Sequence, residues 1–425
     1  MGRRKVINLV LVLAVLLIGF LVQIYSDYLW GNRSEAEEKE EVVRIWTIHG
    51  DIENALNIAL DEYKDKHPNI TFEVTVYKNE VYQTAINNAL LTDSLPDLFF
   101  MWGYTKLQRF VDAGIAQEIT DLVKEENISG QVKKGGLDAF TYNDKIYALP
   151  LYGWKAVLFC NRELFDKYGL KYPENYSEFI KVMNQFKEHG VVPMVSGAKE
   201  GWLSSLYYMS LVQGEGPGDA IYQAVKEKSL FQKKQFVEAA RKMEQISQGG
   251  YWQKNYMEYD AYNAVHLFSQ EEAAMLYYGS WGSSFMEAEI SKVQGKIDVI
   301  PFPNGNKEEG IGGYVDTFVI NKNGVISQNK DLMKMYIEIT GIMSDIAVND
   351  KGSGLPVYND QTVDANKFPI LYKCVADTGN QKLYPAYDQI MSEELSGEYY
   401  SLLNEFVSGE MSYKEFIHSL EVFSE

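Results

Sequence analysis

The feature that most constrains the fold is an alternation of strand-like and helix-like segments near the start of the chain. Val42–Ile48 reads as a strand, and Asp51–Lys66 after it places its apolar residues on one helical face. Ile70–Val76 alternates apolar and polar residues like a half-exposed strand, and Val81–Leu91 is again helical. The apolar run Pro96–Trp102 is typical of a buried strand. This order predicts an α/β domain with a largely parallel sheet.

The alternation starts again in the middle of the chain. Ala156–Cys160 and Val191–Val195 have strand composition, and Glu174–His189 between them has one apolar helical face. From about Asp331 onward the pattern is mostly helical. A chain of 425 residues is too long for one ordinary core and suits two large lobes. The sequence therefore predicts two α/β units.

The N-terminus predicts a membrane anchor. Arg3, Arg4 and Lys5 precede Val6–Ile24, an apolar run that can just span a bilayer core at about 1.5 Å per helical residue. The basic flank should stay in the cytoplasm, which places the rest of the chain outside. We expect residues 1–30 to be an uncleaved signal-anchor segment and residues 31–41 to be a charged linker. The alternative is a cleaved signal peptide and a secreted protein, although no small-residue cleavage site follows the run.

Charge and motif content exclude several classes of function. The net charge of −19 repels phosphate backbones, so nucleic acid is not expected as a partner. Glycine loops that cradle phosphates, the HExxH and GxSxG motifs, and any cluster of histidines are all absent from the sequence. We therefore expect no cofactor, no metal and no catalytic activity. A pair of catalytic carboxylates stays possible, because only geometry reveals it. Cys160 and Cys374 are expected to be buried thiols, with one long-range disulfide as the alternative.

Aromatic residues and glycines recur where strands are expected to end. Ligands of open α/β sheets bind outside the carboxyl ends of strands. Aromatic rings there suit the apolar C–H face of a sugar, and polar neighbours suit its hydroxyl groups. Any one of these residues alone is more often part of a core or a turn, so the prediction rests on their recurrence. The predicted ligand-binding residues are Trp46, His49, Trp102, Tyr104, Tyr152, Trp154, Trp202, Trp281, Tyr314 and Asp316.

Several segments resemble, in the same order, a known family. They include PDLFFMW, YNDKIYALPLYGW, LFCNRELFDKYGL, EEAAMLYYGSWGSS, GGYVDTFVINK and GSGLPVY. From Val42 onward the chain is similar to the extracellular solute-binding proteins of family 1, the maltose-binding-protein-like carbohydrate receptors of ABC importers. The resemblance implies two α/β lobes joined by hinge strands, with the ligand enclosed in the cleft between them.

The resemblance also implies lobe boundaries. Residues 42–149 and 299–325 would form lobe 1, and residues 150–298 and 326–425 would form lobe 2. The chain would cross between the lobes at three places, which are Ala148–Tyr152, Asp298–Phe302 and Asn321–Ile326.

The positions that match sugar-contacting positions of the family are Trp102, Trp154, Trp281 and Tyr314. At Thr105 and Lys106, where some members carry an acidic–basic pair, only the basic residue is present. The lipid-attachment cysteine common in Gram-positive members is also absent near the N-terminus. These two departures leave the sugar and the mode of anchoring open.

The predicted function is that of a monomeric, membrane-tethered extracellular receptor. It would bind a sugar or oligosaccharide between its lobes and deliver it to the permease subunits of an ABC importer. Three alternatives remain at this point. The chain could report sugar to a membrane kinase, bind another small solute such as a polyamine, or act as a glycoside hydrolase.

Overall fold

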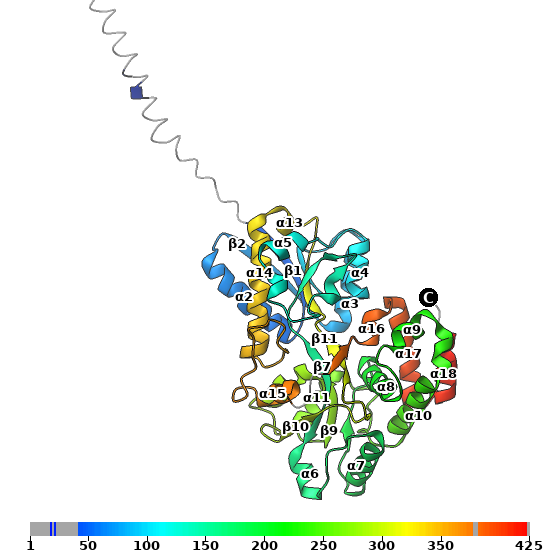
Figure 1. Cartoon of the computed structure of the whole chain (residues 1–425). Helices are drawn as coiled ribbons and strands as arrows, with labels where there is room; N and C mark the ends of the chain where they lie inside the picture. Colours follow the sequence, from blue (N-terminus) through cyan, green and yellow to red (C-terminus); the bar gives the residue numbers. More distant parts are fainter. Residues whose placement is uncertain (1–17, 19–20, 23–40, 377–380, 423–425) are drawn as a thin grey trace, which may run out of the picture.

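The chain folds into two α/β lobes, which lie one above the other in Figure 1. This computed structural model describes residue 18 and residues 21–22, 41–376 and 381–422. In that part of the chain, no helix combines the length and the apolar character needed to cross a membrane. The predicted anchor and residues 31–40 of the predicted linker lie outside the described residues, apart from Ile18, Leu21 and Val22.

The first lobe is built on a five-stranded sheet with the order β2–β1–β3–β12–β6. Its strands are β1 (Glu41–Ile48), β2 (Ile70–Tyr77), β3 (Leu98–Trp102), β6 (Ala148–Pro150) and β12 (Asp316–Ile320). β1 runs parallel to β2 and β3, and β12 is antiparallel to β3 and β6. The predicted parallel α/β start of the chain is thereby confirmed. Its last predicted linker residue, Glu41, already belongs to β1.

The helices of the first lobe cover this sheet because each buries one apolar face. They are α2 (Asp51–Lys66), α3 (Asn79–Leu91), α4 (Thr105–Asp112), α5 (Thr120–Glu125), α13 (Val325–Gln328) and α14 (Lys330–Asp345). A short hairpin, β4 (Thr141–Tyr142) with β5 (Lys145–Ile146), precedes β6. In α2 the apolar stripe from Ile52 to Tyr63 is buried, and α14 packs beside it (Figure 1).

The second lobe is built around β7, all of whose residues are buried. Its strands are β7 (Trp154–Asn161), β8 (Met194–Val195), β9 (Met275–Gly279), β10 (Ile297–Ile300), β11 (Glu309–Gly313) and β13 (Lys382–Tyr384). The order is β13–β11–β7–β9–β8, and β10 also pairs with β7. The predicted strand Val191–Val195 is shorter in the structure, where only Met194 and Val195 pair.

Helices surround this second sheet, and the last of them form the C-terminal part of the lobe. They are α6 (Arg162–Tyr168), α7 (Tyr176–Glu188), α8 (Trp202–Glu215), α9 (Ala220–Lys226), α10 (Lys234–Gln248), α11 (Ala261–Ser269), α12 (Ser283–Glu287), α15 (Pro369–Ala376), α16 (Tyr387–Ile390), α17 (Glu393–Ser408) and α18 (Tyr413–Glu421). α8 is buried on nearly all sides, since α10, α17 and β11 pack against it. Cys160 and Cys374 are both buried, as predicted, and no disulfide joins them.

The first crossing between the lobes lies where the sequence predicted it, and the other two do not. The chain leaves the first sheet after Pro150 and enters the second at Trp154. β10 and β11 both pair with β7, so residues 299–313 belong to the second lobe, and the return occurs between Gly313 and Asp316. An apolar strand pattern fits either sheet, and only the strand to which it hydrogen-bonds decides which lobe it belongs to.

The last crossing also lies later than predicted. Residues 326–345 were expected in the second lobe, yet α14 packs on α2 in the first. The Tyr336 hydroxyl lies 2.8 Å from the Leu149 backbone nitrogen and donates to the Phe318 carbonyl. Lys133 N–H still donates to the Val357 carbonyl, so the chain passes to the second lobe only between Tyr358 and α15.

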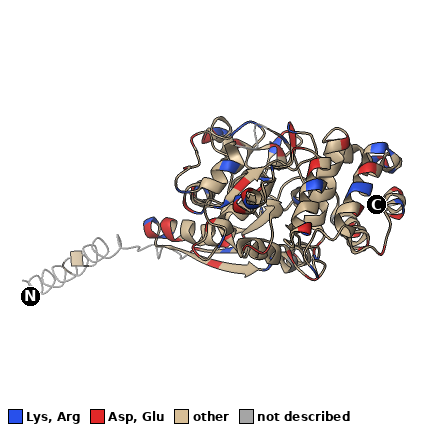
Figure 2. Ribbon diagram, turned by 90° about the horizontal axis from the view of Figure 1, so that it is seen from below, with Lys and Arg blue, Asp and Glu red and all other residues tan. Residues whose placement is uncertain are grey.

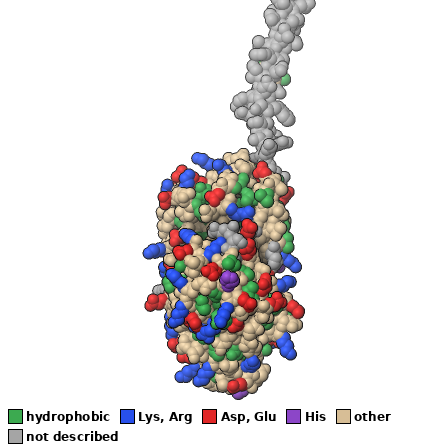
Figure 3. Space-filling model, turned by 90° about the vertical axis from the view of Figure 1, so that its right-hand side faces the viewer, with side chains coloured by type: hydrophobic (Ala, Val, Ile, Leu, Met, Phe, Trp, Pro, Cys, Tyr) green, Lys and Arg blue, Asp and Glu red, His purple; other side chains and the backbone are tan. Residues whose placement is uncertain are grey.

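Acidic and basic side chains are mixed in the views of Figures 2 and 3, so the net negative charge is not concentrated in one patch there. Figure 2 shows Lys and Arg among Asp and Glu on most helices. In Figure 3, hydrophobic side chains form small separate groups between charged ones.

Candidate functional site

Hydrogen bonds join the two lobes along the seam. Ser284 in α12 donates to Asp51 Oδ2 at the start of α2, with 3.1 Å between the oxygens. Thr105, the first residue of α4, places its hydroxyl 2.5 Å from the Gln389 carbonyl and 2.8 Å from the Met391 carbonyl. Both carbonyls follow or belong to α16 of the second lobe. These bonds join the two lobes across the seam.

Three predicted tryptophans come together on the second-lobe side of the seam. Trp154 starts β7, Trp202 starts α8, and Trp281 lies in the turn after β9. The Trp281 ring centroid is 5.0 Å from that of Trp154 and 6.0 Å from that of Trp202. Tyr278 adds a fourth ring, 5.3 Å from Trp281. We call Trp154, Trp202, Tyr278 and Trp281 the tryptophan cluster.

The predicted aromatic residues of the first lobe form a separate row on its sheet. Trp46 packs on Tyr77 at 5.1 Å, Tyr77 on Tyr82 at 5.8 Å, and Tyr82 on Trp102 at 6.3 Å. Trp46 lies two residues before the end of β1 and not at its end. Only Trp102, at the end of β3, lies beside the crossing segment, where it pairs with Asp316.

His49 does not join either group of rings. Its side chain is 73% exposed, and its Nδ1 lies 2.7 Å from the Glu53 carboxylate one helical turn away. Tyr104 adopts φ of 56°, and its carbonyl accepts a hydrogen bond from the Tyr142 hydroxyl. Burial raises the pKa of Tyr222 in the second lobe, and the charge of the nearby Tyr104 raises it further. Tyr104 thus faces the seam, and His49 faces solvent.

Tyr152, Tyr314 and Asp316 lie on the two segments that cross between the sheets. The Tyr314 ring lies directly over Gly153, where an added Cβ would be 2.7 Å from Cε1 of that ring. A glycine is therefore required immediately before Trp154. Tyr152 is buried, and its pKa is raised by burial and by the nearby carboxylates of Asp316 and Asp51. The three residues thus connect the tryptophan cluster to the first lobe.

Asp316 is a buried carboxylate with an unused hydrogen-bonding capacity. Its residue is 9% exposed, and no described residue donates a hydrogen bond to its side chain. Burial raises the pKa of Asp316 to about 7. A buried carboxylate without donors is costly, and hydroxyl or ammonium groups of a ligand would relieve that cost.

Sequence reasoning missed three polar residues at the seam, Asp51, Asp388 and Glu200. Burial raises the pKa of Asp51, and bonding to Ser284 opposes that rise. Burial also raises the pKa of Asp388, against the opposing effects of Lys106 and the Tyr400 hydroxyl. The acidic group near Lys106 is therefore Asp388 on the opposite lobe. The sequence could not reveal it, because the expected acidic residue was the direct neighbour of Lys106, at position 105.

Glu200 is the third of these residues. It accepts a hydrogen bond of 2.8 Å from the Trp202 indole nitrogen and so orients one ring of the tryptophan cluster. The one sequence signal for Glu200 was its position two residues before Trp202.

Two cavities lie close to the site without including any of the predicted residues. The larger, of about 740 Å³, runs between α4 and α17. The other, of about 520 Å³, lies between the C-terminal end of α8 and the loop of residues 305–308.

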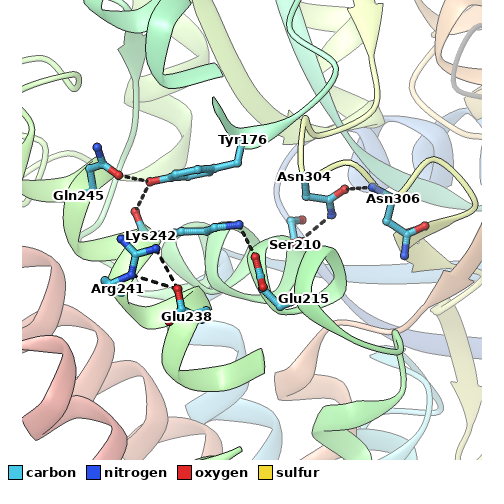
Figure 4. A network of polar contacts seen from close by, with 9 residues as sticks. All are labelled: Tyr176, Ser210, Glu215, Glu238, Arg241, Lys242, Gln245, Asn304 and Asn306. Atoms are coloured by element: carbon cyan, nitrogen blue, oxygen red, sulfur yellow. Dashed lines mark hydrogen bonds and ion pairs between the residues drawn. The ribbon is translucent and has the colours of Figure 1, made fainter. Parts of the chain in front are cut away.

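A polar network fixes the loop that leads to β11 and the crossing. Figure 4 shows Asn304 donating to the Ser210 carbonyl, while the Asn304 side-chain oxygen accepts from Asn306. In the same view Lys242 pairs with Glu215, and the Tyr176 hydroxyl bonds to Gln245. The bond from Asn304 to Ser210 ties this loop to α8. The loop leads to β11 and so supports the segment that carries Tyr314 and Asp316.

Comparisons with known proteins agree with this geometry. The sequence profile of the family "bacterial extracellular solute-binding protein" matches residues 49–331, more than half of the chain. The chain belongs to this family. Its resemblance to family 1, noted from the sequence, is thereby confirmed, as is the two-lobe fold.

Individual relatives of this solute-binding protein are distant in sequence and close in fold. The "multiple sugar-binding protein" of Streptococcus mutans is 22% identical over 66% of this chain and 67% of its own length. A structure reported with xylan utilization by the thermophilic bacterium Caldanaerobius polysaccharolyticus is 26% identical. Its TM-score is 0.83, with 90% of this chain and 99% of that chain covered. A chitin oligosaccharide binding protein has 19% identity and a TM-score of 0.82 over 90% and 98% of the two chains, which shows the fold alone.

Proposed function

We propose that this protein is an extracellular receptor that binds a sugar or oligosaccharide between its lobes and delivers it to an ABC importer. The observation that carries the proposal is that the tryptophan cluster and Asp316 lie on connected segments of the seam: Gly313 pairs with Trp154, and three residues later comes the Asp316 carboxylate, to which no described residue donates. Rings provide the apolar platform for a C–H face, and a carboxylate accepts from hydroxyl groups. The matched sugar-binding relative supports the same class of ligand.

Binding and closure are coupled through contacts that exist only when the lobes meet. A sugar resting on Trp154 and Trp281 would present its hydroxyl groups to Asp316 of the first lobe. Closure would then add the Ser284–Asp51 and Thr105–Gln389 hydrogen bonds. A ligand that favours the closed state by such contacts shifts the population toward it. The permease subunits would then receive the closed form.

The remaining parts of the proposal concern context. We place the receptor outside the cell, where it would act as a monomer tethered by its N-terminal segment, and we assign it no cofactor, metal or catalysis. Within the described residues, no group of three or more His, Cys, Asp or Glu side chains could hold a metal ion. The seam carboxylates Asp51, Asp316 and Asp388 favour one alternative, a cationic solute such as a polyamine.

A thermal-shift screen of the full chain with sugars, polyamines and aryl-glycosides tests these choices. A receptor is stabilised by RT ln(1 + [L]/Kd), about 2.7 kcal/mol at 100 Kd, and releases no product from an aryl-glycoside. If polyamines alone stabilise the protein, the ligand is a cation and not a sugar. Steady turnover of the glycoside would replace the receptor with a hydrolase, and the absence of any shift would refute the proposal.

A further inference from the structure

The larger cavity is a groove that both lobes build together. It lies between α4 of the first lobe and α17 of the second, and its volume of about 740 Å³ is within the usual range of ligand pockets. Thr105 lines it and also forms the interlobe hydrogen bonds to Gln389 and Met391. Tyr104, which faces the seam, immediately precedes Thr105, and Trp102 ends β3 three residues before Thr105, so the groove begins at the seam.

The residues around the groove carry polar groups and charges of both signs, while most of the surface that they expose to it belongs to carbon atoms. α4 contributes Gln108, Arg109 and Asp112, and α17 with its cap contributes Ser392, Glu394 and Glu398. Amides, hydroxyls, carboxylates and a guanidinium can all hydrogen-bond to sugar hydroxyl groups. Three carboxylates against one arginine disfavour an anionic occupant. The groove therefore suits a neutral, hydroxyl-rich chain.

Gly397 leaves the α17 wall of this groove bare. It lies in the interior of a 16-residue helix, where glycine is less favourable than alanine. An added Cβ would meet no atom within 4 Å, and the residue does not need a positive φ. The backbone and the packing of the lobe thus give no reason for glycine here. Its effect is to widen the groove.

We propose that the groove binds the outer units of an oligosaccharide whose inner unit rests on the tryptophan cluster. This inference depends on the proposed function and extends it, because it makes the ligand longer than a disaccharide. The outer units would touch α4 and α17 at once, so they would favour closure as well as add contacts. Chain-length preference would then reside in the groove and the stacking interaction in the cluster.

Gly341 in α14 provides a matched control for Gly397. It is also a helix-interior glycine with no atom within 4 Å of an added Cβ, and it lines neither cavity. Gly397→Leu and Gly341→Leu would be compared in the full chain by isothermal titration calorimetry. The probes are maltose, maltotriose and maltotetraose, then xylobiose, xylotriose and xylotetraose, and then melibiose, raffinose and stachyose. Circular dichroism verifies folding, and Gly397→Ala is a milder variant if leucine disturbs the helix.

The proposal predicts that within at least one series the tri- or tetrasaccharide binds more tightly than the disaccharide. Gly397→Leu should weaken the longer sugar by about tenfold and the disaccharide by less than about twofold, while Gly341→Leu changes neither. Equal effects on long and short sugars, no effect of Gly397→Leu, or no gain with length would each overturn the inference and leave the receptor function intact. Failure of every sugar to bind would overturn both.

Discussion

The two lobes contribute different chemistry to the seam between them. The second lobe brings rings, because the Trp154 and Trp202 rings each lie within about 6 Å of the Trp281 ring. The first lobe brings polar groups, chiefly Asp51, Asp316 and the Thr105 hydroxyl. Its own aromatic row instead packs along its sheet. The difference indicates an order of events in which a sugar stacks on the second lobe and is then enclosed by hydrogen bonds from the first.

The largest expected effect comes from removing the central ring of the tryptophan cluster. Trp281→Ala should weaken sugar binding by about 2–4 kcal/mol, as truncation of a buried aromatic anchor does. The comparison variant is Trp46→Ala in the first-lobe row, which should lower stability with little change in affinity. Calorimetric titration of both variants provides the measurement. Equal losses of affinity in the two would remove the distinction between the lobes.

The next effect concerns the pH dependence of stability through Asp316. Its pKa of about 7 exceeds the value of about 4 in an unfolded chain, so the folded state holds a proton that the unfolded state has lost between these values. The resulting penalty is absent below about pH 4 and complete above about pH 7. Between pH 5 and pH 8 the wild type should therefore lose about 2–3 kcal/mol that Asp316→Asn does not lose. Urea unfolding of the free protein at both pH values measures it.

Asp298 of the second lobe is the control for this pH effect. Burial opposes ionisation of Asp298, but bonds from Lys373 and Tyr172 outweigh it and lower its pKa. Its contribution to stability should thus be lost as the pH falls below about 4, the opposite direction to Asp316. Identical pH profiles for Asp316→Asn and wild type would show that the first-lobe carboxylate is not held in an unfavourable site.

A smaller effect is expected at the interlobe bonds of Thr105. Thr105→Val keeps the shape and removes the donor to the Gln389 and Met391 carbonyls, which should weaken sugar binding by about 1 kcal/mol. Thr92→Val removes a hydroxyl bond to the Asn88 carbonyl within one lobe and should leave affinity unchanged. If Thr92→Val affects affinity as much as Thr105→Val does, the Thr105 bonds do not belong to closure.

The smallest effect compares one open helical glycine in each lobe. Gly341→Ala and Gly397→Ala should each raise the free energy of unfolding by about 0.5–1 kcal/mol, because neither Cβ meets an atom and alanine favours the helix. Chemical denaturation of the two variants measures this change. A loss of stability at Gly397 alone would show that its glycine serves the packing of α17.

The sequence predicted local structure well because local structure depends on spacing. The helix Asp51–Lys66 and the buried strand ending at Trp102 have the predicted type and nearly the predicted bounds. The partner of a strand or helix depends on distant residues. For this reason residues 299–313 and α14 lie with the other lobe than the one predicted for them.

The site shows the same limit. Trp154, Trp202 and Trp281 could be recognised because glycines and turns surround bulky rings at strand ends. His49 fitted that pattern too, and its pairing with Glu53 could not be seen from composition. Asp51 and Asp388 carry no local signal, since each acquires its role only when the opposite lobe arrives.

Hydrogen–deuterium exchange of the full chain with and without a sugar selected by thermal shift tests the central claim most directly. The account predicts slower exchange in the presence of sugar at both faces of the seam. The protected segments should contain Trp154 and Trp281 in the second lobe and Asp51, Thr105 and Asp316 in the first. Protection confined to one lobe, or located away from these segments, would contradict a ligand enclosed between the two.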